Sequence, residues 1–243
     1  MRDVPKHPEA TLSPSEGVTL ALRSAINGGG TRACYRWLTR DSLALFPHVP
    51  ERPRLARLLR THPVWTARLL ATPTVLGVAA TSGIALLHPR RAGRSPQQRG
   101  KQGQSHHRWM VGGKRGVGWN PGGLICVWDW ATANVHDPHF QPLMAQVDHL
   151  MIVLPDPGCH ATTGDPAPLT VGQRGPWNPW MRVATVWSMH TTVLPSKQVR
   201  QRVWAYCRAR VGWTMAAFHL FARWGLEIAD ENMVRLSIAE FSL

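Results

Sequence analysis

The chain has 243 residues, enough for one medium α/β domain with a helical extension or for two small domains. Its 28 Lys and Arg against 14 Asp and Glu give a net charge of +14 at pH 7, which favours a polyanionic partner, with nucleic acid as the leading candidate. The four cysteines are widely spaced and form no CxxC pair, which argues against a zinc or dithiol redox motif: Cys34, Cys126, Cys159 and Cys207.

An uncharged run from Leu69 to Leu87 is just long enough to raise the question of a membrane span. Pro73, Gly77 and Gly83 interrupt this run, so we expect no membrane span. The start of the chain lacks the pattern of a secretory signal. Together these features predict a cytoplasmic protein whose cysteines are reduced.

The first predicted helix begins at a capping box. Ser13 and Glu16 have the capping-box spacing, Pro14 occupies the first helical position, and three glycines from Gly28 end the pattern. Two further helical patterns precede a break at Pro63: residues 31–46 and residues 52–61. Arginines on the outer faces of three short helices suit a small DNA-binding domain, and on pattern alone a plain bundle with solvated arginines is an equal alternative.

From about Thr74 the chain consists of short apolar runs separated by Gly, Pro and Asn, which is typical of strands. Three of these runs predict an antiparallel meander: residues 74–87, 107–119 and 123–133. Asp137 and Pro138 are then expected to start a helix over residues 138–147. A fourth strand, fully apolar in its centre, is predicted to end on Asp156.

Two helical patterns follow, one over residues 180–193 and one over residues 197–224. In the second pattern, apolar side chains recur every three or four residues and predict one buried face: Val203, Cys207, Val211, Met215, Phe218 and Phe221 or Ala222. The arginines of this segment lie off that face: Arg200, Arg202, Arg208 and Arg210.

A basic segment lies between the first two predicted strands, in a stretch from Arg52 to Trp128 that contains no Asp or Glu. A flexible basic loop can follow a phosphate backbone, and we favour this interpretation over a merely solvated loop. The expected DNA-binding residues are Arg90, Arg91, Arg94, Arg99, Lys101, Arg108, Lys114 and Arg115.

Carboxylate chemistry in the middle of the chain is limited to five residues: Asp129, Asp137, Asp148, Asp156 and Asp165. Asp156 ends the fourth predicted strand, where a carboxylate can serve as a ligand of Mg²⁺ or Mn²⁺ or simply form a turn. The nearby histidines lack a zinc-type spacing, so we interpret them as surface or core residues: His136, His139, His149 and His160, the last beside Cys159.

A series of motifs runs in order along the chain: LSPSEGVTLAL, LLHPRRAGRSPQQRGKQGQSHHRWMVGGK, WATANVHDPHFQPL, MIVLPDPGCHATTGDP, RGPWNPWMRVATVWSM, VWAYCRARVGWTMAAFHLF and LSIAEFSL. This series resembles the DDE transposases of bacterial insertion sequences and covers the chain from Leu12 to Leu243. The resemblance implies an α/β fold with an RNase H-like mixed sheet flanked by helices, preceded by a small helical N-terminal region. It also implies three carboxylates that hold two divalent metals for DNA strand cleavage and transfer.

The three acid positions of the family can each be matched to a residue of this sequence, and only one of those residues is an acid. The first acid of the family falls on Ala80, the second on Asp156 and the third on Ala184. The acid inventory agrees, because no Asp or Glu occurs between Asp165 and Glu227, nor anywhere in the first predicted strand. The expected catalytic and metal-binding set is therefore reduced to Asp156, with Mg²⁺ or Mn²⁺ as the cofactor if the protein is active and none otherwise.

The residue patterns and the resemblance together predict three regions: a disordered leader over residues 1–12, a helical DNA-binding region over 13–72 and an RNase H-like domain over 73–243. We expect a nucleoid-associated DNA-binding protein of transposase ancestry that does not cut DNA, and a homo-oligomer is left open. Three rivals remain: a regulatory or domesticated DNA-binding protein, a decayed gene product, and an active transposase in which Asp129, Asp137 or Asp165 joins Asp156.

Overall fold

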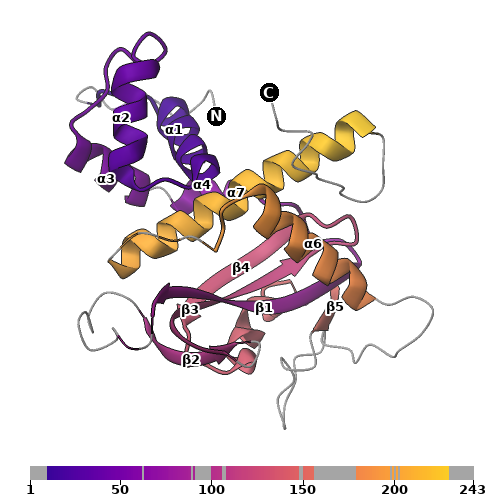
Figure 1. The fold of residues 1–243 in the computed structure, drawn as a ribbon. Helices are drawn as coiled ribbons and strands as arrows, with labels where there is room; N and C mark the ends of the chain where they lie inside the picture. Colours follow the sequence, from indigo (N-terminus) through magenta and orange to yellow (C-terminus); the bar gives the residue numbers. More distant parts are fainter. Residues whose placement is uncertain are drawn as a thin grey trace.

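The computed structural model describes residues 10–61, 63–88, 90, 100–105, 108–147, 150–155, 179–197, 199, 201 and 203–229. Figure 1 shows a group of N-terminal helices above a sheet, with the long helix α7 (Trp204–Ala229) between the two parts and α6 (Pro179–Val193) lying over the sheet. The predicted α/β class is confirmed, since a mixed five-stranded sheet is flanked by helices and preceded by a helical region.

The sheet is built around β3, which is bordered by three other strands. Along one edge β3 pairs antiparallel with β1, while on the other edge its first half pairs with β2 and its second half with β4. β5 lies parallel to β1 on the far side, with Leu76 opposite Ile152 and Ala79 opposite Pro155. The strands are β1 (Leu76–Leu87), β2 (Lys101–Ser105), β3 (Arg108–Trp119), β4 (Ile125–Thr132) and β5 (Ile152–Pro155).

Each face of the sheet is covered by helices. On one face, α6 (Pro179–Val193) and α7 (Trp204–Ala229) pack against a core that includes Ala80 and Val117. On the other face, the 3₁₀ turn η2 (Asp137–Phe140) and the short helix α5 (Gln141–Ala145) cover a smaller cluster. Neighbouring residues of β1 therefore point to opposite layers, as the period of a strand requires.

Four helices form the N-terminal region: α1 (Pro14–Asn27), α2 (Thr31–Asp41), α3 (Arg52–Thr61) and α4 (Pro63–Arg68). The predicted capping box is confirmed, because the Ser13 hydroxyl accepts from the Glu16 amide and the Glu16 carboxylate accepts from the Ser13 amide. Gly28 ends α1 with a φ of 66°, in the left-handed region that favours glycine. A small core fills the space between these helices: Leu12, Leu20, Leu38 and Leu55.

α7 joins the helical region to the sheet. From Val211 to His219 every residue of this helix is buried, because it packs against helices on one side and strands on the other. Arg210 donates from Nη1 to the Ser24 carbonyl and from Nη2 to the Ala25 carbonyl, the latter at 2.9 Å. Trp213 Nε1 donates to the Leu59 carbonyl of α3 at 2.9 Å. The domain boundary predicted near residue 72 thus falls inside one continuous hydrophobic core.

Several local expectations need correction. Leu12, placed in a disordered leader, is buried in the small core. Pro63 does not end the helical region but opens α4, since proline is tolerated in the first turn of a helix. The second predicted helix ends at Asp41, five residues early, and its last residues form turns.

Further differences concern the sheet and α7. Lys101–Ser105 forms the strand β2, although the sequence analysis predicts a basic loop there. The segment has no alternating apolar pattern that would indicate a strand. Asp137 does not cap a helix; it belongs to η2, for which His136 is the N-cap residue. The last helix begins at Trp204 rather than near Lys197, while its predicted apolar face is confirmed from Cys207 to Ala222.

None of the described helices is long and apolar enough to cross a membrane, and most of the uncharged run ending at Leu87 forms β1. Cys34, Cys126 and Cys207 are buried free thiols, in agreement with the expectation of reduced cysteines. Cys159 lies outside the described residues.

Replacement of Arg210 tests whether its docking to α1 stabilises the fold. Arg210→Met should lower the free energy of unfolding by about 2–4 kcal/mol, because two buried carbonyls lose a charged donor. Urea denaturation followed by circular dichroism measures the change. Arg208→Met, at an exposed position of the same helix, is the control and should cost less than about 1 kcal/mol. Equal costs for the two variants would contradict the docking role.

Candidate functional site

The two alanines at which the sequence analysis expected acids, Ala80 and Ala184, lie in β1 and in α6. Ala80 is buried in β1, on the face covered by α6 and α7. Ala184 is an exposed residue of α6, and Val186, two residues later, packs in the same core cluster as Ala80. Asp156 follows Pro155 in the sequence and lies outside the described residues. The structure therefore locates two of the three expected positions, and neither carries a carboxylate.

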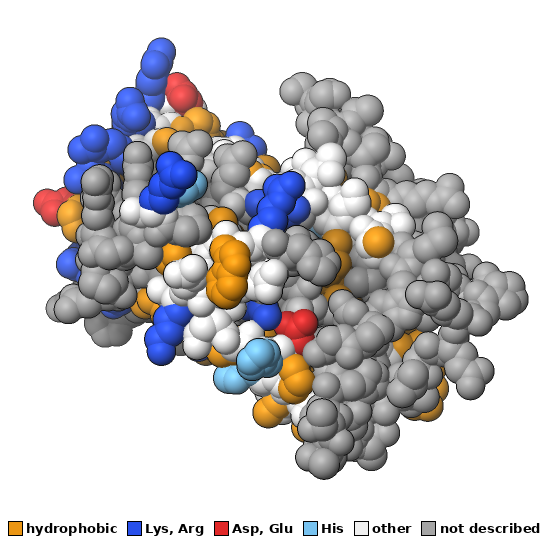
Figure 2. All heavy atoms as spheres, turned by 60° about the horizontal axis from the view of Figure 1, so that its bottom comes forward, with side chains coloured by type: hydrophobic (Ala, Val, Ile, Leu, Met, Phe, Trp, Pro, Cys, Tyr) orange, Lys and Arg blue, Asp and Glu red, His pale blue; other side chains and the backbone are white. Residues whose placement is uncertain are grey.

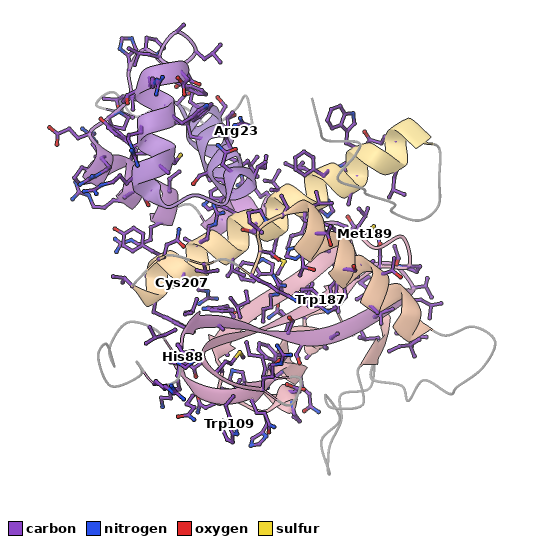
Figure 3. The ribbon with its side chains drawn as sticks, viewed as in Figure 1. Arg23, His88, Trp109, Trp187, Met189 and Cys207 are labelled. Atoms are coloured by element: carbon purple, nitrogen blue, oxygen red, sulfur yellow. The ribbon has the colours of Figure 1, made fainter. Side chains whose placement is uncertain are left out.

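Arg115 is fully buried beside Ala80 on this face of the sheet. Val117 pairs with Ala80 and Arg115 pairs with Ser82, so Arg115 and Ala80 are diagonal neighbours across β3 and β1. The Arg115 guanidinium carbon lies 4.2 Å from the centre of a Trp187 ring, and Figure 3 shows Trp187 between α6 and the sheet. The guanidinium Nε and Nη2 have no hydrogen-bond partner, and among the described residues no acid pairs with this side chain.

Burial without compensation changes the proton affinity of Arg115. Desolvation lowers the pKa of its guanidinium to about 9, well below the usual value for arginine. The cation–π contact with Trp187 offsets part of that cost, because a desolvated pair of this kind is worth about 2 kcal/mol. A buried cation beside Ala80, without a described acid to pair with it, is the main electrostatic feature of this face.

His190 lies in the same layer and is neutral at physiological pH. Its ring meets Trp187 and Phe218 edge to face, with centroids 5.7 Å and 5.0 Å away. Burial lowers the pKa of His190 well below 6.5, and the nearby charge of Arg115 lowers it further. Neither ring nitrogen has a hydrogen-bond partner. This histidine is therefore a desolvated core residue rather than an exposed proton-transfer group.

The residues at this site do not fit a pair of divalent metals. Such metals need bridging and flanking carboxylates, whereas Ala80 and Ala184 offer methyl groups and Arg115 adds a positive charge. Elsewhere, Asp129 pairs with Arg208 at 3.1 Å and Asp137 pairs with Lys114 at 2.8 Å. Within the described parts of the chain, no three His, Cys, Asp or Glu side chains form a group that could hold a metal.

Among the residues that the structure describes, the remaining acids and histidines of the prediction do not gather in one place. Asp129 and Asp137 are each engaged by a different cation, so neither joins a described acidic cluster. His136 and His139 are exposed, in agreement with their interpretation as surface residues. Two acids and two histidines of the prediction lie outside the described residues: Asp148, Asp165, His149 and His160.

The predicted DNA-binding residues divide into exposed and buried groups. Arg90, Lys101 and Arg108 are exposed. Lys114 and Arg115 do not lie on the predicted DNA-binding loop, because both are buried side chains of β3. Lys114 pairs with Asp137, and Arg115 lies under Trp187. The side chains of Arg91, Arg94 and Arg99 lie outside the described residues. The basic segment is thus partly a strand, and only its exposed cations can reach a phosphate.

Trp109 is an exposed aromatic residue that the sequence did not single out. It follows Arg108 at the start of β3, opposite Gln104 of β2, and its side chain is 63% exposed. Figure 3 shows it on the side of the sheet away from α6 and α7. An indole next to exposed cations is a recurrent element of single-stranded nucleic-acid binding. The sequence shows that this tryptophan follows a basic residue, but only the structure shows that its indole is exposed.

A larger group of cations lies on the helical region, where Figure 2 shows Lys and Arg side chains gathered at the upper left. Between Thr31 and Arg60 there are two acids, Asp41 and Glu51, and seven arginines, all of them exposed: Arg32, Arg36, Arg40, Arg52, Arg54, Arg57 and Arg60. The outer surface of α2 and α3 is therefore strongly positive.

Comparisons with protein-family models, with curated proteins and with solved structures give no match for this chain.

Arg115 provides a test of the electrostatic description of this face. Arg115→Met keeps an unbranched side chain under Trp187 and removes the buried charge, so the free energy of unfolding should rise by about 1–4 kcal/mol. Urea denaturation at pH 7 measures the change, with Arg210→Met as the control whose buried guanidinium is hydrogen-bonded. A loss of stability in Arg115→Met would mean that its charge is compensated.

Proposed function

We propose that this protein binds DNA through an exposed arginine surface and that it descends from a DDE transposase without retaining the ability to cut DNA. The observation that carries the proposal is the surface of α2 and α3, with seven exposed arginines and two acids. Phosphate contacts from such a surface give affinity that is independent of sequence and sensitive to salt.

The arginines of α2 are arranged for contact with a linear polyanion. Arg32, Arg36 and Arg40 are spaced four residues apart and form one stripe along the helix. Cys34 and Leu38 are buried on another side and fix the helix against its neighbours. The stripe is therefore held on a packed element, which limits the entropy lost when the side chains meet phosphates.

A second surface supports the same partner. Lys101 and Arg108 are exposed on β2 and β3, and the exposed indole of Trp109 lies beside Arg108. Cations attract the backbone, and an exposed indole can stack on an unpaired base. We assign this surface a supporting role, because it has fewer described cations than α2 and α3.

Efficient strand cleavage is not expected, because the carboxylates that would hold the metals are missing. Two-metal cleavage needs clustered carboxylates, and positions 80 and 184 provide none. Asp156 alone cannot bridge and flank two metals. The buried charge of Arg115 beside Ala80 opposes cation binding on that face still further.

DNA binding should weaken with salt in proportion to the number of arginine–phosphate contacts. The double variant Arg32→Gln/Arg36→Gln should reduce the slope of log affinity against log salt by up to about 1.8, since each lost contact to duplex DNA removes about 0.9. Fluorescence anisotropy with a labelled duplex measures the slope. Arg223→Gln, an exposed α7 arginine paired with Glu227, is the control and should leave it unchanged. No salt-dependent binding by the native chain would refute the proposal.

Cleavage should require restoration of both acids. The native chain should not nick supercoiled plasmid in Mn²⁺, whereas Ala80→Asp/Ala184→Glu should gain nicking activity because three carboxylates are then available. Thermal unfolding of the double variant checks that the buried Asp is tolerated. Nicking by the native chain that disappears in Asp156→Ala would show that other acids complete an active site.

A further inference from the structure

A cavity of about 550 Å³ lies where the N-terminal helices meet the sheet and α7. It is separate from the Ala80 and Arg115 layer and from the arginine stripe of α2. Its lining comes from four elements: Arg60 of α3, Thr66 and Ala67 of α4, Trp128 of β4, and Ala205, Arg208, Ala209, Gly212 and Trp213 of α7. The volume falls within the range of small-molecule sites.

Small residues of α7 create the space. Ala205, Ala209 and Gly212 recur at helical spacing on one face of the helix. At Gly212 the helix approaches Trp128 so closely that a Cβ atom would lie 2.8 Å from the Cζ2 atom of the indole. A larger residue there would clash with Trp128, so glycine is needed for the close approach of helix and strand.

Two indoles form rigid walls. Trp213 is almost fully buried, and its Nε1 donates to the Leu59 carbonyl at 2.9 Å, which fixes the ring. Trp128 is partly buried and packs against Gly212 from β4. Walls of this kind suit a flat aromatic group, because stacking on an indole needs an ordered ring face.

Two exposed guanidinium groups line the same cavity. Arg60 lies over the Tyr206 ring, with 5.3 Å from its guanidinium carbon to the ring centre. Arg208 pairs with Asp129 at 3.1 Å, and the two side chains are 62% and 42% exposed. Exposed ion pairs of this kind contribute at most about 1 kcal/mol, so Arg208 can exchange its partner for a phosphate at little cost.

We propose that this cavity binds a nucleotide unit, with the base against Trp128 and the phosphate at Arg60 and Arg208. The combination of an indole wall and two arginines matches a ligand that joins an aromatic ring to a phosphate group. The site goes beyond the DNA-binding proposal, because it would hold a single nucleotide unit rather than the backbone of a duplex. That unit can come from a free nucleotide or from an unpaired position of a DNA strand.

Isothermal titration calorimetry of the native chain with dAMP tests the proposal. Binding of dAMP should be at least about tenfold tighter than binding of adenosine or of inorganic phosphate, because only dAMP engages both the indole and the arginines. Competition of dAMP by a single-stranded oligodeoxyadenylate would identify the DNA strand as the source of the nucleotide. Absence of competition, with dAMP still bound, would identify the free nucleotide.

Three variants locate the site. Arg208→Gln and Arg60→Gln should each weaken dAMP binding about tenfold. Ala205→Phe, which adds a ring at an exposed lining position, should abolish it. Arg223→Gln is the matched control, because its ion pair with Glu227 resembles that of Arg208 with Asp129. Circular dichroism melting confirms folding.

Two outcomes would overturn the proposal: no dAMP binding at millimolar concentration, or binding that Ala205→Phe and Arg208→Gln leave unchanged. Because the variants of the α2 stripe are not part of this site, loss of duplex binding in those variants with dAMP binding intact would separate the two proposals.

Discussion

The contact between Arg210 and the end of α1 is the interaction on which the rest of the arrangement depends. The last carbonyls of a helix lack partners inside the helix, and the end of α1 carries no basic residue of its own. Arg210 supplies the missing charge and donors from α7. Since the other side of α7 packs on the sheet, this contact ties the arginine-bearing helices to the sheet, together with the shared hydrophobic core.

The two buried arginines show that a basic composition is not the same as a basic surface. Arg210 has carbonyl partners, whereas Arg115 has an indole face and two nitrogens without partners. Among the described residues, the exposed arginines are concentrated on α2 and α3, where acids are scarce.

Local signals predicted much of the fold, because they depend on neighbouring residues alone. The capping box at Ser13, the bounds of α3 and the apolar face of α7 all follow from short patterns. β2 was missed because Lys101–Ser105 reads as a polar loop and is held only by pairing with β3. Burial of Arg115 could not be predicted, since a charged residue between glycines is typical of an exposed segment.

The candidate sites also differ in how far the sequence alone predicts them. The absence of acids at positions 80 and 184 was visible in the sequence, since no alternative carboxylate exists in those segments. The cavity beside Trp128 was not, because its lining comes from four elements separated by long stretches of chain. Only the docking of α7 brings Arg60 and Arg208 to one opening.

The distance along the chain between the partners of this docking contact has a consequence for biosynthesis. Arg210 and the Ser24 carbonyl are 186 residues apart. At ribosomal rates of roughly 5–20 residues per second, α1 waits about 10–40 s for the helix that covers it. During that interval its apolar side, with Val18 and Ala25, is open to other surfaces. The apolar side of α1 therefore stays uncovered in the nascent chain until α7 has emerged.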